Sequence, residues 1–257
     1  CLSVLTLNQT PGTLMEKVRK ICEDAFDEVL ERMNANYAKF LQATGQPQKK
    51  LPWTRKVVDF MTLYEEARDA NGEAFEKEYR AELETLRRKL ENHELTLLDC
   101  NFSLLDFVYG YIDDLSPRVV YGLIPPYYPN VSNRFIPGLS DQIRNLGEDL
   151  DQFAQQQFGQ HYTSEEFYTG ISDLSYTSLF NGEAISAALS KSMPFFNSLY
   201  DIPVSEIESI SMPCINIGPW GKDFHKLTER VLKQDLYERT PAILRHAIGL
   251  VLDDGRK

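Results

Sequence analysis

Apolar residues recur at steps of three and four between Pro11 and Gly45, which predicts one long amphipathic helix. Thr10 suits the N-cap of this helix, and Pro11 suits its first turn, where a backbone N–H would have no intrahelical partner. The apolar stripe consists of Leu14, Val18, Ile21, Cys22, Ala25, Val29, Met33, Tyr37 and Phe40. The segment TGQPQ around Gly45 interrupts the pattern, so the helix is expected to end there.

Shorter patterns flank this helix. Residues 2–7 have the apolar and β-branched content of a strand, and TRKVVDFMTLYEEA predicts a strand that leads into a helix. A second helical stripe lies on the charged segment that follows, at Phe75, Tyr79, Leu83, Leu86 and Leu90. The simplest interpretation is that this stripe faces the core; a partner-binding surface is the alternative. The segment LLDCNFSLLDFVYGYIDDLSP predicts a further helix that closes the first region.

The pattern changes at Pro117. The run RVVYGLIPPYYP is typical of a buried parallel strand that prolines terminate, and MPCINIGP is a second candidate for such a strand. Helices are expected from about Ser140 to Gln157 and over TPAILRHAIGLVL. Strands that alternate with helices indicate an α/β sheet. We therefore predict an α+β domain over residues 1–115 and part of an α/β domain over residues 116–257.

Composition narrows the class of protein. A content of 42% hydrophobic and 25% charged residues is that of a soluble globular protein, and no apolar run has the length of a membrane span. The net charge of −11 disfavours the nucleic-acid backbone as a partner. We expect no signal peptide, and because the four cysteines show no CxxC spacing, we expect reduced thiols and a cytoplasmic location.

Several short motifs do not carry chemistry. GPWGKD lacks the spacing of a phosphate-binding loop, and no Ser or Cys lies in a GxSxG-like turn. The adjacent acids Glu165 and Glu166 fit the first turn of a helix better than a catalytic pair. His93 is expected on an exposed, charged helix, and His161 and His246 have no metal-ligand neighbour at suitable sequence spacing.

The segment INIGPWGKDFHKLTERV is the strongest candidate site. Gly218 follows a predicted buried strand, and ligands in α/β folds gather at the carboxyl ends of such strands. Gly218 and Gly221 allow close backbone approach. His225 and Glu229 would share a helix face, on which the carboxylate could orient the imidazole. Taken alone, such a pair is more often a surface pair than a metal site.

The order of the motifs resembles a known family. YTGISDLSYTSL, then an apolar strand, then GPWGKDFHKLTERV is similar to the distal half of the dinuclear-zinc amidohydrolase and exopeptidase family, which includes aminoacylases, acetylornithine deacetylase, succinyl-diaminopimelate desuccinylase and zinc carboxypeptidases. VLTLNQTPG, VVDFMTLYEE and PRVVYGLIPPYYPNVSNR resemble its arginine-utilisation branch, and the likeness runs along essentially the whole chain. It implies a three-layer zinc-exopeptidase-like catalytic domain, two zinc ions, and an inserted α+β lid over residues 1 to about 115 that dimerises.

The same resemblance implies roles for residues. His225 would be the last zinc ligand in chain order, and Glu229 would support it. The substrate pocket would be shaped by Ser172, Asp173, Gly218, Pro219, Trp220 and Gly221, whose backbone amides could hold a carboxylate or an oxyanion. Ser175 stands about where the family has an arginine, and NGEAISAALSKSMPFFNSLYDIP has the character of an insertion.

The family's other zinc ligands and its general-base Glu would precede Cys1. We therefore expect this chain to be the C-terminal portion of a longer protein, inactive alone, with the N-terminal half of the catalytic domain as its partner. The parent would be a zinc-dependent hydrolase of amide or peptide bonds in amino-acid derivatives or small peptides, and the branch points to arginine catabolism. The alternative is a non-catalytic dimerisation or interaction module; an HxD motif and a Glu-Glu pair encoded upstream of Cys1 would favour the enzyme.

Overall fold

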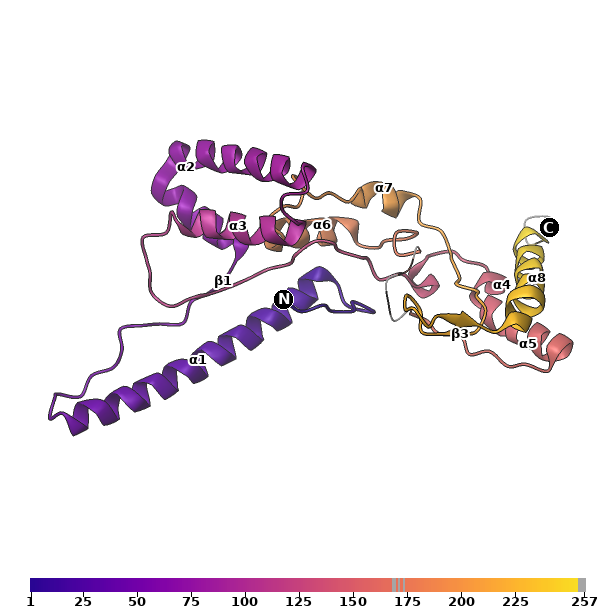
Figure 1. The fold of residues 1–257 in the computed structure, drawn as a ribbon, viewed down its shortest axis with the longest axis horizontal. Helices are drawn as coiled ribbons and strands as arrows, with labels where there is room; N and C mark the ends of the chain where they lie inside the picture. Colours follow the sequence, from indigo (N-terminus) through magenta and orange to yellow (C-terminus); the bar gives the residue numbers. More distant parts are fainter. Residues whose placement is uncertain (168–169, 171, 173, 254–257) are drawn as a thin grey trace. The chain divides into compact units, whose positions relative to one another are not determined.

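The computed structural model describes residues 1–167, 170, 172 and 174–253, and the chain divides into two compact units (Figure 1). The unit that we call the helical unit comprises Asn8–Tyr127 and Asn181–Ser205. The unit that we call the C-terminal unit comprises Cys1–Leu7, Tyr128–Phe180 and Glu206–Lys257. Helices and small strands occur together, which is compatible with the α/β class. The predicted division into domains at residues 1–115 and 116–257 stays a prediction.

The long first helix is confirmed as α1 (Pro11–Ala43), with its N-terminal end near α6 (Gly182–Ser192) in Figure 1. The hydroxyl of Thr10 accepts a hydrogen bond from the Thr13 N–H at 3.2 Å, and the hydroxyl of Thr13 accepts one from the Thr10 N–H at 3.1 Å. This reciprocal cap satisfies two of the N–H groups that a helix start leaves unpaired. Gly45, with a φ of 66°, follows the last turn as expected.

Two further helices form the core of the helical unit. The predicted strand is β1 (Val57–Asp59), and it leads directly into α2 (Phe60–Glu91), where the Asp59 carboxylate accepts a hydrogen bond from the Thr62 N–H at 2.9 Å. Gly72 interrupts α2 with a φ of 59° and a ψ of −140°. The next predicted helix is confirmed as α3 (Leu97–Tyr109), which lies beside α2 (Figure 1). Their shared core contains Phe60, Leu63, Ala67, Phe75, Leu86, Cys100, Leu104, Val108, Ile112 and Phe195.

The strand predicted after Pro117 is much shorter than expected. Only β2 (Val119–Tyr121) is a strand, and it pairs in parallel with β1, with Val57 opposite Val119. A parallel strand in this run is confirmed, but it covers only three residues, which are half-buried rather than buried. The chain leaves β1 at once, because the Leu123 N–H bonds to the Ser192 carbonyl of α6 at 2.7 Å and prolines follow at 125 and 126.

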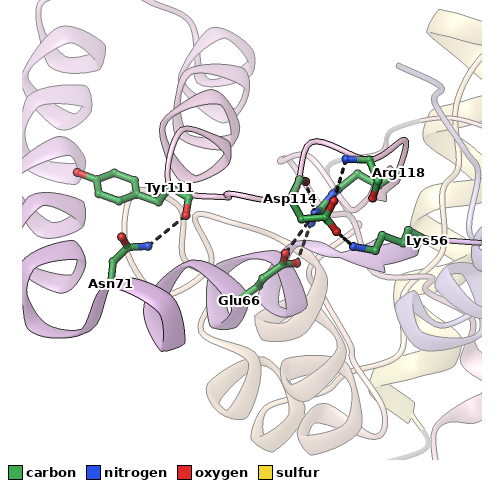
Figure 2. A network of polar contacts seen from close by, with 7 residues as sticks. Lys56, Glu66, Asn71, Tyr111, Asp114 and Arg118 are labelled. Carbon is green, nitrogen blue, oxygen red and sulfur yellow. Dashed lines mark hydrogen bonds and ion pairs between the residues drawn. The ribbon is translucent and has the colours of Figure 1, made fainter. Parts of the chain in front are cut away.

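A polar network ties the segment before β2 to α2 (Figure 2). Arg118 pairs with Glu66 of α2, and Lys56 forms an ion pair with Asp114. The Asn71 amide of α2 donates to the backbone carbonyl of Tyr111 at 3.1 Å. These side-chain contacts thus hold the loop between α3 and β2 against α2 and β1.

The C-terminal unit has a small core of its own. The helix predicted from Ser140 to Gln157 is confirmed as two helices, α4 (Asp141–Arg144) and α5 (Leu146–Phe158), and the last predicted helix is α8 (Thr240–Asp253). Buried residues of α5 and α8 pack together: Leu146, Leu150, Ala154, Ile243 and Ala247. The remaining elements are η1 (Asn133–Phe135), α7 (Val204–Ser209), β3 (Gly221–Lys222), β4 (Arg230–Val231) and the π-helix η2 (Asp235–Arg239).

Two predicted strands of the C-terminal unit are not formed. Residues 2–7 and the segment MPCINIGP lie outside the strands of the described chain. A strand is stable when a neighbour satisfies its backbone groups. Here side chains take that role, because the Asn133 amide bonds to both the N–H and the carbonyl of Cys214. Within the described residues, no helix is both long and apolar enough to cross a membrane.

Candidate functional site

The candidate metal ligand His225 lies in the loop of a β-hairpin. Gly221 of β3 pairs with Val231 of β4, and Lys222 pairs with Arg230, in antiparallel register. The prediction that His225 and Glu229 share a helix face is therefore wrong. His225 has a φ of 60°, in the left-handed region that a right-handed helix excludes.

Glu229 supports the backbone of this loop. Its carboxylate accepts a hydrogen bond from the backbone N–H of His225 at 3.1 Å. The Asp223 carboxylate closes the same loop from the other side: it accepts from the Thr228 hydroxyl at 3.1 Å and forms an ion pair with Arg230. His225 is exposed on the hairpin that these contacts hold. Its role as a metal ligand stays a prediction.

The turn before the hairpin contains the predicted pocket residues Gly218, Pro219, Trp220 and Gly221. A Cβ atom on Gly221 would lie 2.9 Å from the backbone oxygen of Arg230, so this close approach of two strands requires glycine. A Cβ atom on Gly218 would meet nothing within 4 Å. The predicted close backbone approach is therefore found at Gly221, where the approaching group is the backbone of Arg230. At Gly218 no atom of the protein lies close.

Trp220 is anchored through its backbone. Its N–H donates to the carboxylate of Asp235 at 3.1 Å, and its carbonyl accepts from the Leu232 N–H at 2.9 Å. Trp220 is 56% exposed, and the ammonium of Lys222 lies 5.3 Å from the centroid of its ring. The turn thus presents an indole and a cation next to each other at the surface.

The loop around Ser172 lies against the segment that leads to Gly218. The Asn216 amide donates to the Ser172 hydroxyl at 3.3 Å, and the Met212 N–H donates to the Thr177 carbonyl at 3.0 Å. The Ser175 hydroxyl accepts from the Ser172 N–H at 3.3 Å, which closes the loop on itself. Two parts of the predicted site, about forty residues apart in sequence, are therefore in contact. Asp173 lies outside the described residues.

Glu166 contacts two side chains that the sequence did not indicate. It accepts from the Ser132 hydroxyl at 3.2 Å and lies 3.4 Å from the Arg134 guanidinium. Glu165 and Glu166 lie outside any helix, so the prediction that they open a helix is wrong. Residues 132–134, which contact Glu166, also include Asn133, whose amide binds the backbone of Cys214. In the sequence, these residues stood out only as part of PRVVYGLIPPYYPNVSNR, a segment that carries the family resemblance.

The other histidines have ordinary partners. His161 Nδ1 lies 3.2 Å from the Asp151 carboxylate, a contact across ten residues that sequence spacing did not indicate. The His246 ring stacks on Phe153 at 4.1 Å between centroids. His93 is exposed, as predicted, but it follows the end of α2 rather than lying within it.

Asp151 organises an open pocket beside α5. The Tyr162 N–H donates to its carboxylate at 2.6 Å, and this hydrogen bond, followed by the one from His161, lowers the pKa of Asp151. The pocket has a volume of about 290 Å³ and is lined by Gly147, Glu148, Asp151, Gln152, Tyr162 and Ser164.

The described residues do not form a metal site by themselves. No three of the described His, Cys, Asp and Glu side chains lie close enough together to hold one ion. A structural zinc site takes four protein ligands and a catalytic one takes three. A zinc ion at His225 would therefore need ligands from outside the described residues.

Two proteins of Bacillus subtilis (strain 168) are similar to this chain along almost its whole length. Protein YqjN is 27% identical over 252 residues, which are 97% of this chain and 43% of YqjN. Protein RocB is 21% identical over 251 residues, which are 96% of this chain and 43% of RocB. The chain thus spans less than half the length of these relatives. No family model and no solved structure matches it.

Proposed function

We propose that this chain is the C-terminal portion of a metal-dependent hydrolase of amide or peptide bonds in amino-acid derivatives or small peptides. The observation that carries the proposal is the contact between the Ser172 loop and the segment leading to Gly218 and His225. These are the motifs in which the chain resembles the zinc amidohydrolases. The similarity to RocB over 96% of the chain supports it, and the resemblance to the arginine-utilisation branch extends it to arginine catabolism.

In this proposal the two parts of the chain have different tasks. Residues 1–115 act as a lid, and residues 116–257 belong to a three-layer catalytic domain. The turn from Gly218 to Gly221 and the hydroxyl of Ser172 line the place where a small substrate binds. His225 is offered as one ligand of a zinc ion, which when bound would polarise a carbonyl group and a water molecule. The other ligands belong to the longer protein, and the chain alone is inactive.

The test compares two exposed histidines of the C-terminal unit in the full-length protein. His225→Ala is expected to lower the zinc content and to abolish hydrolysis of N-acylated amino acids, N-acyl arginines included. His161→Ala is the matched control, because His161 is an exposed histidine that contacts Asp151. This variant should keep both the zinc content and the hydrolysis. Zinc content is measured by atomic emission and turnover by release of the free amino group.

Unchanged zinc and turnover in His225→Ala would contradict the ligand assignment. Absence of both zinc and hydrolysis from the unmodified full-length protein would contradict the function.

One feature of the helical unit favours a second candidate, a homodimerisation module. The apolar stripe predicted for α1 is largely uncovered, with Ile21 67%, Val29 55%, Met33 42% and Phe40 55% exposed. The buried residues of this helix are Pro11, Met15 and Leu41. An apolar stripe of this length on one helix is typical of a partner surface.

Light scattering after size exclusion tests this candidate. We expect a dimer for the chain and a monomer for the double variant Val29→Glu, Met33→Glu, because two charges would have to be buried without partners. Gln42→Glu adds a charge at an exposed polar position of the same helix and should leave the dimer intact. A chain that stays monomeric at high concentration would exclude the dimer.

A further inference from the structure

Asp235 is a buried carboxylate at the start of η2. Its residue exposure is 3%, so its charge needs partners inside the protein. One oxygen accepts from the Arg239 guanidinium at 2.8 Å, and the other accepts from the Trp220 N–H at 3.1 Å. Both contacts are charge-assisted hydrogen bonds, which are about twice as strong as neutral ones.

Arg239 balances this charge from the same π-helix. Its side chain is 13% exposed, and it lies four residues after Asp235. Burial raises the pKa of the Tyr162 phenol, and the negative charge of Asp235 raises it further. The carboxylate is therefore held by groups from two segments of the C-terminal unit, η2 and the Trp220 turn.

The hydrogen bond to Trp220 lies next to the start of the hairpin. Trp220 is held on both sides of its backbone, by Asp235 at the N–H and by Leu232 at the carbonyl. The next residue, Gly221, already pairs with Val231, and its backbone approaches Arg230 too closely for a Cβ atom. A shift of Trp220 is therefore transmitted to the strand that leads into the His225 loop.

We propose that Asp235, with its charge balanced by Arg239, is a positioning residue that holds the Trp220 turn and the His225 hairpin in place. Its role in a site rests on the proposed function. The contact between Asp235 and Trp220, by contrast, can be tested without any activity. The π-helix supplies the carboxylate, and insertions of this kind are frequent at functional sites.

Hydrogen exchange of the Trp220 amide in the 257-residue chain directly tests the hydrogen bond between Asp235 and Trp220, which we call the Asp235 clamp. Asp235→Ala removes the acceptor, and exchange of this amide is expected to rise by about tenfold or more relative to amides of α5 and α8. Asp235→Asn keeps an oxygen that can accept the Trp220 N–H and should restore most of the protection. Glu238→Ala changes an exposed acid of the same π-helix and should have no effect.

A core variant separates local from global effects. Leu150→Ala weakens the core of the same unit, so it should raise the exchange of α5, α8 and hairpin amides together. If Trp220 exchange in Asp235→Ala is unchanged, or rises only in step with α5 and α8, the clamp is wrong.

The role in the site is tested in the full-length protein. Asp235→Ala should lower zinc content and turnover at least tenfold, with recovery in Asp235→Asn. Fast local exchange at Trp220 combined with full zinc content and turnover would overturn the role in the site while leaving the clamp intact. A full-length protein without zinc or hydrolysis would overturn the proposed function instead, and with it that role.

Discussion

The guanidinium of Arg118 donates two hydrogen bonds to the carboxylate of Glu66, at 2.7 and 3.2 Å (Figure 2). It donates a third hydrogen bond to the backbone carbonyl of Asp114, at 2.7 Å. The Arg118 side chain is only 2% exposed, whereas that of Glu66 is 39% exposed. A buried cation is therefore held at the edge of the core by a carboxylate that still reaches water.

Glu66→Ala should destabilise the helical unit by about 1–3 kcal/mol, because it leaves the buried guanidinium without its bidentate partner. Glu28→Ala is the control: it removes an ion pair with Arg32 whose side chains are 76% and 63% exposed. Exposed pairs of this type contribute at most about 0.5 kcal/mol. Urea unfolding measures both, and equal losses would show that burial of Arg118 does not strengthen the pair.

Gly72→Ala should destabilise the same unit by about 1–3 kcal/mol, because a φ of 59° with a ψ of −140° is a conformation that glycine alone adopts readily. Gly12→Ala is the matched change within a regular helical turn, where the new Cβ would lie 3.7 Å from Ala188, at ordinary contact distance. We expect that variant to be neutral or slightly stabilising. Thermal unfolding followed by circular dichroism distinguishes the two; a stabilised Gly72→Ala variant would mean that α2 is not kinked at this residue.

Leu104→Ala should lower the free energy of unfolding by about 2–5 kcal/mol, because Leu104 is fully buried and its removal leaves a cavity between α2 and α3. Leu98→Ala makes the same chemical change on the same helix at a position that is 40% exposed. The free energy of unfolding that Leu98→Ala loses should be several times smaller. Denaturant titration gives both values, and similar losses would contradict the burial of Leu104.

Asp151→Ala should destabilise the C-terminal unit above about pH 5, and this effect should become smaller as the pH falls below about 4. The folded state lowers the pKa of Asp151, through the Tyr162 N–H and then through His161, so it favours the charged carboxylate. The stabilisation is therefore present above the unfolded pKa of about 3.9 and disappears as the pH falls through the folded pKa.

The measurement is the difference in melting temperature between wild type and variant across this pH range. Gln152→Ala changes a neutral neighbour in the same pocket, and its difference should not vary with pH. A wild-type advantage that grows as the pH falls from 6 to 3 would reverse the sign of the effect.

Short-range sequence patterns predicted most of the long helices, but not α6, which lies in the segment that has the character of an insertion. The cap at Thr10 and the glycine at 45 act on residues next to them, so the two ends of α1 could be placed from local chemistry alone. The kink at Gly72 was missed, because glycine within a charged helical pattern is compatible with a straight helix as well.

The content of the candidate site stays a prediction, and its expected geometry is only partly confirmed. Its residues were singled out by motif order, and the contact between Ser172 and Asn216 does join two of the motifs. The helix expected at His225 is a hairpin, because pairing of Gly221 with Val231 overrides the helical pattern of the segment.

For this protein, local patterns along the chain placed α1, the start of α2, α3 and α8, because caps and apolar periodicity act within a few residues. Folding alone established which side chains meet. Arg118 finds Glu66 across 52 residues and Asp235 finds Trp220 across 15. Such pairs form where the packing of distant segments buries a charge, and the cost of leaving that charge unpaired selects its partner.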